Sequence, residues 1–285
     1  MKKPPSIEDA RNWFAEDLRL ASPVVHNPAI IDAFAKVPRE LFLGEGPWWI
    51  HPRQFDRPAT ISPTADPRHI YHDVLVSIDH DLGINNGLPS LWAYYFDQLA
   101  ITPGATVLQV GAGVGYFTAI LAELVSPKGR VVAYEIDDDL AKRATANLSE
   151  HPNVKVIAGD AVNARDLPEL DVIVVFAGAT HVPEHWLSNL SQSGRIAVPL
   201  TADDHWGFML KLEKRSGAVL ATSLGRCGFF HCESARRPSE ALALKTALAA
   251  VSGTIPPLDQ MRFGRPEPKD ATAWYVGDGF WLSKA

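Results

Sequence analysis

Two patterns of apolar and polar residues alternate through the middle of the chain, and together they predict its architecture. Nearly continuous apolar runs are typical of strands covered on both faces, whereas apolar residues at helical spacing indicate amphipathic helices. Because the two alternate, we predict an α/β fold with a doubly wound, mostly parallel sheet of Rossmann-like type. The strands are expected at residues 107–110, 131–136, 154–157, 172–177 and 195–199, and the helices at residues 117–125, 138–151 and 183–190.

The segment before this region shows weaker patterns. Apolar spacing indicates helices at residues 6–20 and 28–37, the second of which ends where proline follows Val37. Residues 44–72 are rich in proline and lack periodicity, which predicts a long irregular arm that serves as a surface wrap or a lid. A short strand at 73–78 and a polar loop at 79–90 follow, and Ser90 is the expected N-cap of a helix at 91–99.

The segment after the alternating region has a different character. We predict two antiparallel strands at 206–214 and 220–230, because the connection between them is too short for a crossover. An alanine- and leucine-rich helix at 238–251 should end at Gly253, and Gly277-Asp278-Gly279 should turn a hairpin. These patterns divide the chain into an N-terminal arm and cover (1–78), a core (79–234) and a C-terminal extension (235–285).

Composition and charge exclude several classes of protein. The 285 residues are 46% hydrophobic and 21% charged, which is a normal globular composition. The formal net charge of -6 gives no electrostatic footprint for nucleic acid or an anionic membrane, and no apolar run is long enough to span one. Cys227 and Cys232 are too few for a disulfide framework. We expect a soluble, cytoplasmic protein.

The sequence VLQVGAGVGY, residues 107–116, carries the main indication of function. An apolar strand breaks into Gly111-Ala112-Gly113-Val114-Gly115, and a helical pattern begins at once. That order lets a ligand approach the backbone and places helix N–H groups beside it. A dinucleotide fingerprint would need a third glycine at position 116, which is Tyr116, so an NAD-dependent oxidoreductase is disfavoured.

Two acidic residues refine the choice of ligand. Glu135 ends the second strand of the pattern, where a carboxylate can accept hydrogen bonds from two ribose hydroxyls. Asp160 ends the next strand and can face an adenine amino group. In this order the residues favour an adenosyl ligand without a pyrophosphate.

With these motifs in view, the chain resembles the protein-L-isoaspartate O-methyltransferase family, whose members use S-adenosylmethionine. VLQVGAGVGY is similar to the first family motif, VVAYEI (131–136) to the ribose-binding strand, and AGDA (158–161) to the adenine loop. The run from Asp171 to Leu200, with DVIVVFAGATHVPEHWL and then LSQSGRIAVPL, is the most specific match, and AFAKVPRELFL (33–43) is similar to an N-terminal signature.

The resemblance implies a cofactor, S-adenosyl-L-methionine, and a role for each matched residue. Glycines of the first motif should line the methionine moiety, Glu135 should hold the ribose, and the residues around Asp160 should hold the adenine. The predicted cofactor-binding residues are Gly111, Ala112, Gly113, Gly115, Tyr116, Glu135, Ile136, Gly159, Asp160, Ala161 and Ala177.

The loop before the helix at 91–99 departs from the family pattern. Family members carry Thr-Ile-Ser-Gln-Pro there, with hydroxyls that contact the substrate carboxyl, whereas this chain has Asn85-Asn86-Gly87-Leu88-Pro89. Asn85 and Asn86 are the predicted substrate-positioning residues, because a carboxamide can donate to a carboxylate. An Asn-Gly turn that serves only the geometry of the loop is the alternative.

The histidines bear on the choice of acceptor. A carboxylate nucleophile needs no general base, but a hydroxyl or amine acceptor would, and His80, His181 or His205 could supply it. His181 and His185 have the spacing of a metal pair, but Pro183 separates them and no third ligand is apparent, so no metal is expected.

We predict a methyltransferase that acts on a carboxyl group of a peptide, a protein or a related acceptor. A small-molecule (natural-product) methyltransferase and a non-catalytic adenosyl-binding scaffold are the alternatives. The extension carries Trp274, Phe280 and Trp281, which suggests that it covers the substrate cleft or forms a subunit contact in a homo-oligomer.

Overall fold

The computed structural model describes residues 4–20, 25–52, 58–251 and 254–285. Contacts divide the chain into two compact units. The first contains Met1–Gly104, Ala112–Val131 and Asp137–Ala158, and the second contains Ala105–Gly111, Val132–Ile136 and Gly159–Ala285. Gly111 and Ala112, which are consecutive in the glycine motif, therefore belong to different units.

The first unit is mainly helical, and its predicted helices are confirmed to within a few residues. Rings from different helices meet edge to face in its core: Phe34 of α2 contacts Phe14 of α1 at 6.3 Å between centroids and Phe117 of α5 at 6.3 Å. One short helix, α3, was not predicted. The elements are α1 (Ile7–Leu20), α2 (Pro28–Lys36), α3 (Glu40–Leu43), α4 (Pro89–Leu99), α5 (Tyr116–Val125), α6 (Asp138–Asn147) and strand β7 (Val154–Ala158).

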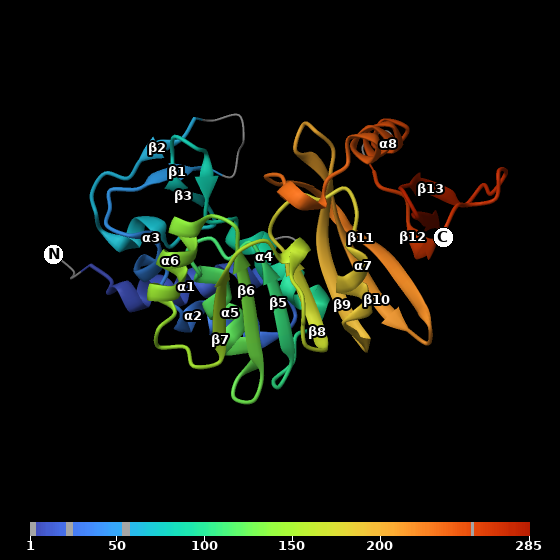
Figure 1. Ribbon diagram of the computed structural model, residues 1–285. Coiled ribbons are helices and arrows are strands. Elements are labelled where there is room, and N and C mark those ends of the chain that lie inside the picture. Colours follow the sequence, from blue (N-terminus) through green and yellow to red (C-terminus); the bar gives the residue numbers. More distant parts are fainter. Residues whose placement is uncertain (1–3, 21–24, 53–57, 252–253) are drawn as a thin grey trace. The chain divides into compact units, whose positions relative to one another are not determined.

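The arm predicted to be irregular contains a small antiparallel sheet, so that prediction was wrong in part. Its strands follow in the order β2-β1-β3-β4 (Figure 1). Two of them lie in the arm, and each is too short to show a period of two in the sequence. The elements are β1 (Trp49–His51), β2 (Thr60–Ile61), the 3₁₀ helix η1 (Pro67–Ile70), β3 (Leu75–Asp79) and β4 (Ile84–Asn85).

The N-cap predicted at Ser90 was also wrong. Helix α4 begins at Pro89, and Leu88 occupies the cap position without a side-chain hydrogen bond. Ser90 lies inside the first turn, where its backbone N–H donates to Oδ1 of Asp73 at 2.9 Å. A carboxylate from a distant residue therefore satisfies the start of this helix, which local sequence could not indicate.

The second unit contains a mixed sheet built on the predicted strands. β5 pairs with β8, and β8 with β9, in parallel. β10 and β11 are antiparallel, as predicted, and β10 is also antiparallel to β9. The elements are β5 (Thr106–Val110), β6 (Arg130–Glu135), the 3₁₀ helix η2 (Ala161–Asn163), β8 (Leu170–Val175), α7 (Glu184–Ser188), β9 (Leu190–Thr201), β10 (Trp206–Arg215), β11 (Ala218–Gly228) and the 3₁₀ helix η3 (Glu233–Ala235).

The C-terminal extension continues this sheet. Its elements are α8 (Pro238–Ala249), β12 (Leu258–Phe263), β13 (Ala273–Val276) and β14 (Phe280–Lys284). The hairpin of β13 and β14 was predicted, but β12, in the proline-rich segment, was not. Because β12 pairs with β11, the strands of this unit follow in the order β13-β14-β12-β11-β10-β9-β8-β5-β6. The helix ends before Ala250, and Gly253 lies outside the described residues.

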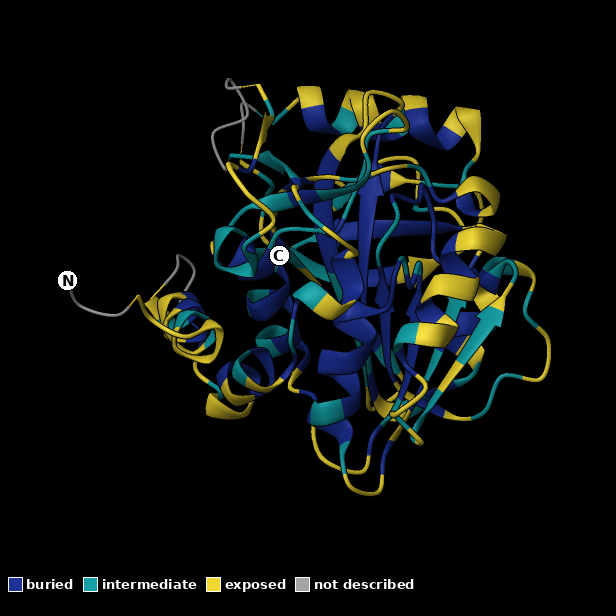
Figure 2. Cartoon of the chain, turned by 90° about the vertical axis from the view of Figure 1, so that its left-hand side faces the viewer, coloured by how far each residue is buried: buried dark blue, intermediate teal, exposed yellow. Residues whose placement is uncertain are grey.

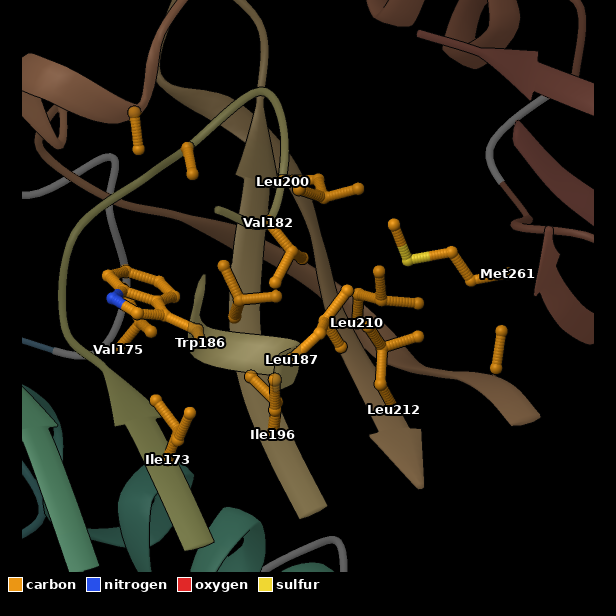
Figure 3. Close-up of a cluster of buried hydrophobic side chains, with 14 of the residues drawn as sticks. Ile173, Val175, Val182, Trp186, Leu187, Ile196, Leu200, Leu210, Leu212 and Met261 are labelled. Carbon is orange, nitrogen blue, oxygen red and sulfur yellow. The ribbon is translucent and has the colours of Figure 1, made fainter. Parts of the chain in front are cut away.

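A large apolar core joins the extension to the rest of the second unit. Figure 3 shows Trp186 and Leu187 of α7 beside Ile173 of β8, Ile196 of β9 and Leu210 of β10. Buried residues of the extension, such as Leu244, Tyr275, Phe280 and Leu282, belong to the same cluster. Figure 2 shows buried residues in dark blue along the central strands, whereas several outer helices show exposed residues in yellow along one side.

Candidate active site

The second unit gathers several predicted cofactor residues at the carboxyl ends of its strands. The Gly111 N–H donates to the Tyr134 carbonyl at 2.9 Å, and the Gly159 N–H donates to the Glu135 carbonyl at 2.8 Å. Ala177 follows the carboxyl end of β8. Backbone hydrogen bonds thus hold the ends of β5 and β6 and the segment at Gly159 side by side, at the edge where open α/β sheets bind ligands.

The polar side chains at this edge differ in environment. Glu135 is buried, with 6% of its surface exposed, whereas Ile136 beside it is 55% exposed. Asp160 caps η2: its Oδ1 accepts from the Val162 N–H at 2.8 Å and its Oδ2 from the Asn163 amide at 2.6 Å. Each carboxylate oxygen retains capacity for a second hydrogen bond, so a ligand amino group can still be bound there.

The remainder of the glycine motif lies in the first unit. Gly115 precedes α5, and a Cβ there would lie 2.8 Å from Cδ1 of Leu148, so only glycine allows this close approach. A Cβ at Gly113 would meet only Cδ1 of Ile78, at 3.8 Å. A side chain at Gly113 would thus make an ordinary van der Waals contact near the N-terminus of a helix, and the bare glycine fits a ligand that approaches the backbone.

Tyr116 stands apart from the other predicted cofactor residues. Its side chain is 1% exposed and packs edge to face against Phe42, with 5.7 Å between ring centroids. Burial raises the pKa of its hydroxyl, so the group stays protonated. The ring belongs to the core of the first unit, and only the backbone of Tyr116 can contribute to a ligand site at the helix start.

The two asparagines before α4 make different hydrogen bonds. Asn85 lies opposite Ser77, and its Oδ1 accepts the Gly87 N–H at 2.9 Å, which closes a local turn. The Asn86 N–H donates to the carbonyl of the fully buried Val76 at 2.9 Å. Asn86 directly follows the end of β4, and this hydrogen bond holds its backbone against β3.

Asn86 has an unsatisfied hydrogen-bond donor. The residue is 6% exposed, and its Nδ2 finds no acceptor among the residues that the structure describes. A buried amide donor without a hydrogen-bond partner costs about 1–3 kcal/mol of folding free energy. The geometry of Asn85 is explained by its turn, but that of Asn86 is not, which makes Asn86 the stronger candidate for contact with a ligand.

Gly87 cannot readily carry the hydroxyl that the family pattern has in this loop. Its φ is +73°, and a Cβ would lie 2.8 Å from Nε1 of Trp92 and 3.1 Å from Cε2 of Phe117. The indole of Trp92, which is buried in α4, fills the space beside this position. Sequence reasoning missed Trp92, Ile78 and Phe176 as neighbours of the glycines, because no local pattern marks such contacts.

The three histidines considered as bases have different partners. The ring of His80 stacks on Trp49 at 3.9 Å between centroids. In the second unit, Nδ1 of His181 hydrogen-bonds Oε2 of Glu240 at 2.9 Å, and His205 stacks on His231 at 4.1 Å. His185 lies 3.4 Å from the Ala161 carbonyl, so the two histidines that have the spacing of a metal pair make separate contacts. Nothing in the sequence pattern indicated Glu240.

The chain was compared with known families, proteins and structures. The sequence model of Protein-L-isoaspartate(D-aspartate) O-methyltransferase (PCMT) matches residues 59–236, more than half of the chain. The chain belongs to this family. It is 29% identical over 238 residues to a protein-L-isoaspartate O-methyltransferase of Methanothrix thermoacetophila, covering 80% of this chain and 98% of the relative. It is also 32% identical to the enzyme of Gloeobacter violaceus, covering 69% of this chain and 85% of the relative.

Two solved structures show the same fold. A protein-L-isoaspartate O-methyltransferase aligns with a TM-score of 0.65 at 20% identity, covering 96% of this chain and 88% of the other. A putative protein-L-isoaspartate O-methyltransferase from Plasmodium falciparum, in complex with S-adenosyl-L-homocysteine, aligns with a TM-score of 0.61 at 20% identity, covering 78% of this chain and 97% of the other.

These comparisons confirm the predicted α/β class I methyltransferase fold, with a mixed sheet. The chain is an S-adenosylmethionine-dependent methyltransferase, a transferase of class EC 2.1.1. In the second unit, the buried carboxylate of Glu135 and the remaining acceptor capacity of Asp160 fit the adenosyl part of the cofactor. Within the described part of the chain, no helix is long and apolar enough to cross a bilayer.

Proposed function

We propose that this enzyme transfers a methyl group to the carboxylate of an aspartyl-type residue in a peptide or protein, and that Asn86 holds that carboxylate. The buried Nδ2 of Asn86, which lacks an acceptor among the described residues, is the observation that carries the proposal. A carboxylate oxygen is the acceptor that such a donor binds most strongly. The isoaspartyl carboxyl named for the relatives is the first acceptor to examine.

We propose a division of labour among the cofactor residues as well. The glycine motif, Gly111 to Gly115, would accommodate the methionine moiety, Glu135 the ribose hydroxyls, and Asp160 with Ala161 the adenine. This assignment is supported by the buried carboxylate of Glu135 and by the backbone hydrogen bond from Gly159 to its carbonyl at 2.8 Å. Ile136, Gly159 and Ala177 would contribute contacts at the same edge of the sheet.

The proposed reaction needs no general acid or base from the protein. S-adenosylmethionine supplies a methyl group on a sulfonium centre, which is already activated for displacement. A carboxylate attacks without losing a proton, so the residues of this chain have to position the acceptor and exclude water. Asn86 would do the first by donating a hydrogen bond to the carboxylate oxygen that does not attack. The buried Val76 and the half-buried Ile78 of β3 would do the second.

The structure of the loop also favours a specialised acceptor. Trp92 and Phe117 crowd position 87, so the loop is built for glycine and does not offer the hydroxyl of the family pattern. A small-molecule carboxylate is therefore the second candidate acceptor. A non-catalytic adenosyl-binding scaffold would retain the cofactor residues but would have no use for the unsatisfied donor of Asn86.

Methyl transfer from labelled cofactor to an isoaspartyl peptide, beside a panel of small carboxylic acids, tests the proposal. We expect base-labile methyl ester on the peptide, and a loss of about tenfold to a hundredfold in kcat/KM for Asn86→Ala, as expected when a donor to a charged group is removed. The Kd for S-adenosylhomocysteine should not change. Asn85→Ala, which removes a turn contact, is the matched control. Labelled product from small acids alone would contradict the peptide acceptor and support a small-molecule carboxylate. Cofactor binding without any ester product would support a non-catalytic adenosyl-binding scaffold.

A further inference from the structure

An exposed cluster of aromatic rings lies beside the carboxyl end of β8 in the second unit. It consists of His205, Trp206, Phe230 and His231, and we call it the aromatic platform. Trp206 is 53% exposed and Phe230 is 49% exposed, although most large apolar residues of this unit are buried. His205 stacks on His231 at 4.1 Å and contacts Phe230 edge to face at 6.2 Å. No assigned role in cofactor binding or catalysis uses these rings.

The topology places the platform at the ligand-binding edge of the sheet. β8 and β9 are parallel, so β9 ends, at Thr201, on the same edge as β8. β10 is antiparallel to β9 and begins at that edge with Trp206, and β11 returns to it and ends at Gly228. The platform therefore lies on the edge that carries Gly111, Glu135, Gly159 and Ala177, where open α/β sheets bind their ligands.

Backbone contacts fix the platform next to the proposed cofactor residues. The N–H of Gly178, which follows Ala177, donates to the Phe230 carbonyl at 2.6 Å. Arg236 donates to the Gly178 carbonyl at 3.0 Å, to the Thr201 carbonyl at 3.1 Å and to Oδ1 of Asp203 at 3.0 Å. One guanidinium thus ties the end of β8 to the turn that begins the platform, so the distance between them is set by the fold.

The surface of the platform suits an uncharged, flat or apolar group. Burial lowers the pKa of His231, and the neighbouring charges of Arg236 and His205 lower it further, so this imidazole is neutral at physiological pH. The indole of Trp206 lies over Gly228, where an added Cβ would be 3.4 Å from the ring. Aromatic faces of this kind bind aromatic and large apolar side chains through stacking and burial.

We propose that the aromatic platform binds a residue of the acceptor peptide next to the methylated carboxylate, and that it selects an aromatic or large apolar side chain there. The inference rests on the proposed function, because it takes the acceptor to be a peptide. It assigns Trp206 and Phe230 as specificity residues, which contact the acceptor away from the reacting atoms. The platform would recognise the sequence context of the methylated residue.

Two isoaspartyl peptides that differ only in the neighbouring residue, phenylalanine or serine, test this inference. We expect a roughly tenfold lower KM for the phenylalanine peptide with the wild-type enzyme, and similar kcat for both. Trp206→Ala should abolish the preference, and Trp206→Phe should keep most of it. Phe263→Ala removes a ring on β12 that is 60% exposed. It is the matched control and should change neither KM nor kcat for either peptide.

Calorimetric binding of both peptides in the presence of S-adenosylhomocysteine separates the two proposals. If neither peptide is methylated but the phenylalanine peptide still binds more tightly through Trp206, the proposed carboxyl chemistry fails and the platform stands. If methyl esters form and neither KM nor Kd distinguishes the peptides, the platform is refuted and the proposed function stands. Equal effects of Trp206→Ala and Phe263→Ala would also refute the platform.

Discussion

At the residue scale, two adjacent asparagines before α4, Asn85 and Asn86, differ in their hydrogen bonds although they carry the same side chain. Asn85 lies opposite Ser77 in the small sheet, and the N–H of Asn86 donates to the Val76 carbonyl. The side-chain oxygen of Asn85 accepts a hydrogen bond within the turn, whereas the buried Nδ2 of Asn86 has no acceptor among the described residues. The sequence could suggest that an amide replaces the family hydroxyls, but it could not tell that the Asn86 donor is buried without a described acceptor.

Restoring a hydroxyl at Gly87 should harm the enzyme. A serine there would combine a positive φ with a Cβ 2.8 Å from Nε1 of Trp92. Gly44 has nearly the same φ, +70°, but a Cβ there meets nothing within 4 Å, so Gly44→Ser reports the backbone strain alone. We expect Gly87→Ser to lower the free energy of unfolding by about 1–3 kcal/mol more than Gly44→Ser, because of overpacking. Urea unfolding checks this, and equal losses would show that Trp92 moves aside.

At the scale of elements, helix α8 is attached to the loop after β8 through one buried carboxylate. Oε2 of Glu240 accepts from the Thr180 hydroxyl at 2.7 Å and hydrogen-bonds His181 at 2.9 Å. Oε1 accepts from the Arg237 guanidinium and from the Asp278 N–H, each at 3.0 Å. The residues that meet here come from three separate segments, so the periodicity of α8 in the sequence could predict the helix but not its anchor.

This anchor should give stability that depends on pH. Burial alone would raise the pKa of Glu240, but hydrogen bonds from His181, the Asp278 backbone and Thr180 lower it from 4.5 to about 2. A depressed carboxyl pKa stabilises the fold above the unfolded value and loses that contribution as the pH falls toward 2. We expect Glu240→Gln to cost about 3 kcal/mol at pH 7 and about half of that at pH 3.

Unfolding by urea at the two pH values measures this difference. Glu267→Gln, on an exposed carboxylate of the same extension, is the control and should show no such dependence. A constant difference between wild type and Glu240→Gln from pH 7 to pH 3 would contradict the proposed linkage.

At the scale of the whole molecule, the extension is part of the second unit and shares its core. Phe280 and Trp281, which suggested an exposed surface, are 4% and 5% exposed, and Trp274 packs against Phe208 at 5.4 Å between centroids. Strand β12 continues the sheet beside β11. These rings are used inside the unit, and a subunit contact through the extension stays a prediction that analytical ultracentrifugation can address.

Because the extension shares the core, it should unfold together with the second unit. Phe280→Ala removes a buried ring and should cost about 3–5 kcal/mol, which thermal unfolding would record as a lower Tm for the transition that also abolishes cofactor binding. Phe263→Ala, on an exposed ring of the same extension, should leave that transition unchanged. A separate early transition that spares the binding of S-adenosylhomocysteine would show that the extension folds independently.

The sequence by itself determined the alternating strands and helices, the glycine motif with its acidic partners, and the family, because each depends on residues that are close in the chain or on a pattern of fixed spacing. Only the tertiary structure decided that the Asn86 amide is buried without a described acceptor, that Trp92 excludes a side chain at position 87, that Glu240 anchors α8, and that the rings of His205, Phe230 and His231 meet at the edge of the sheet. These contacts join residues distant in sequence, and their energies depend on burial and geometry that no local pattern encodes.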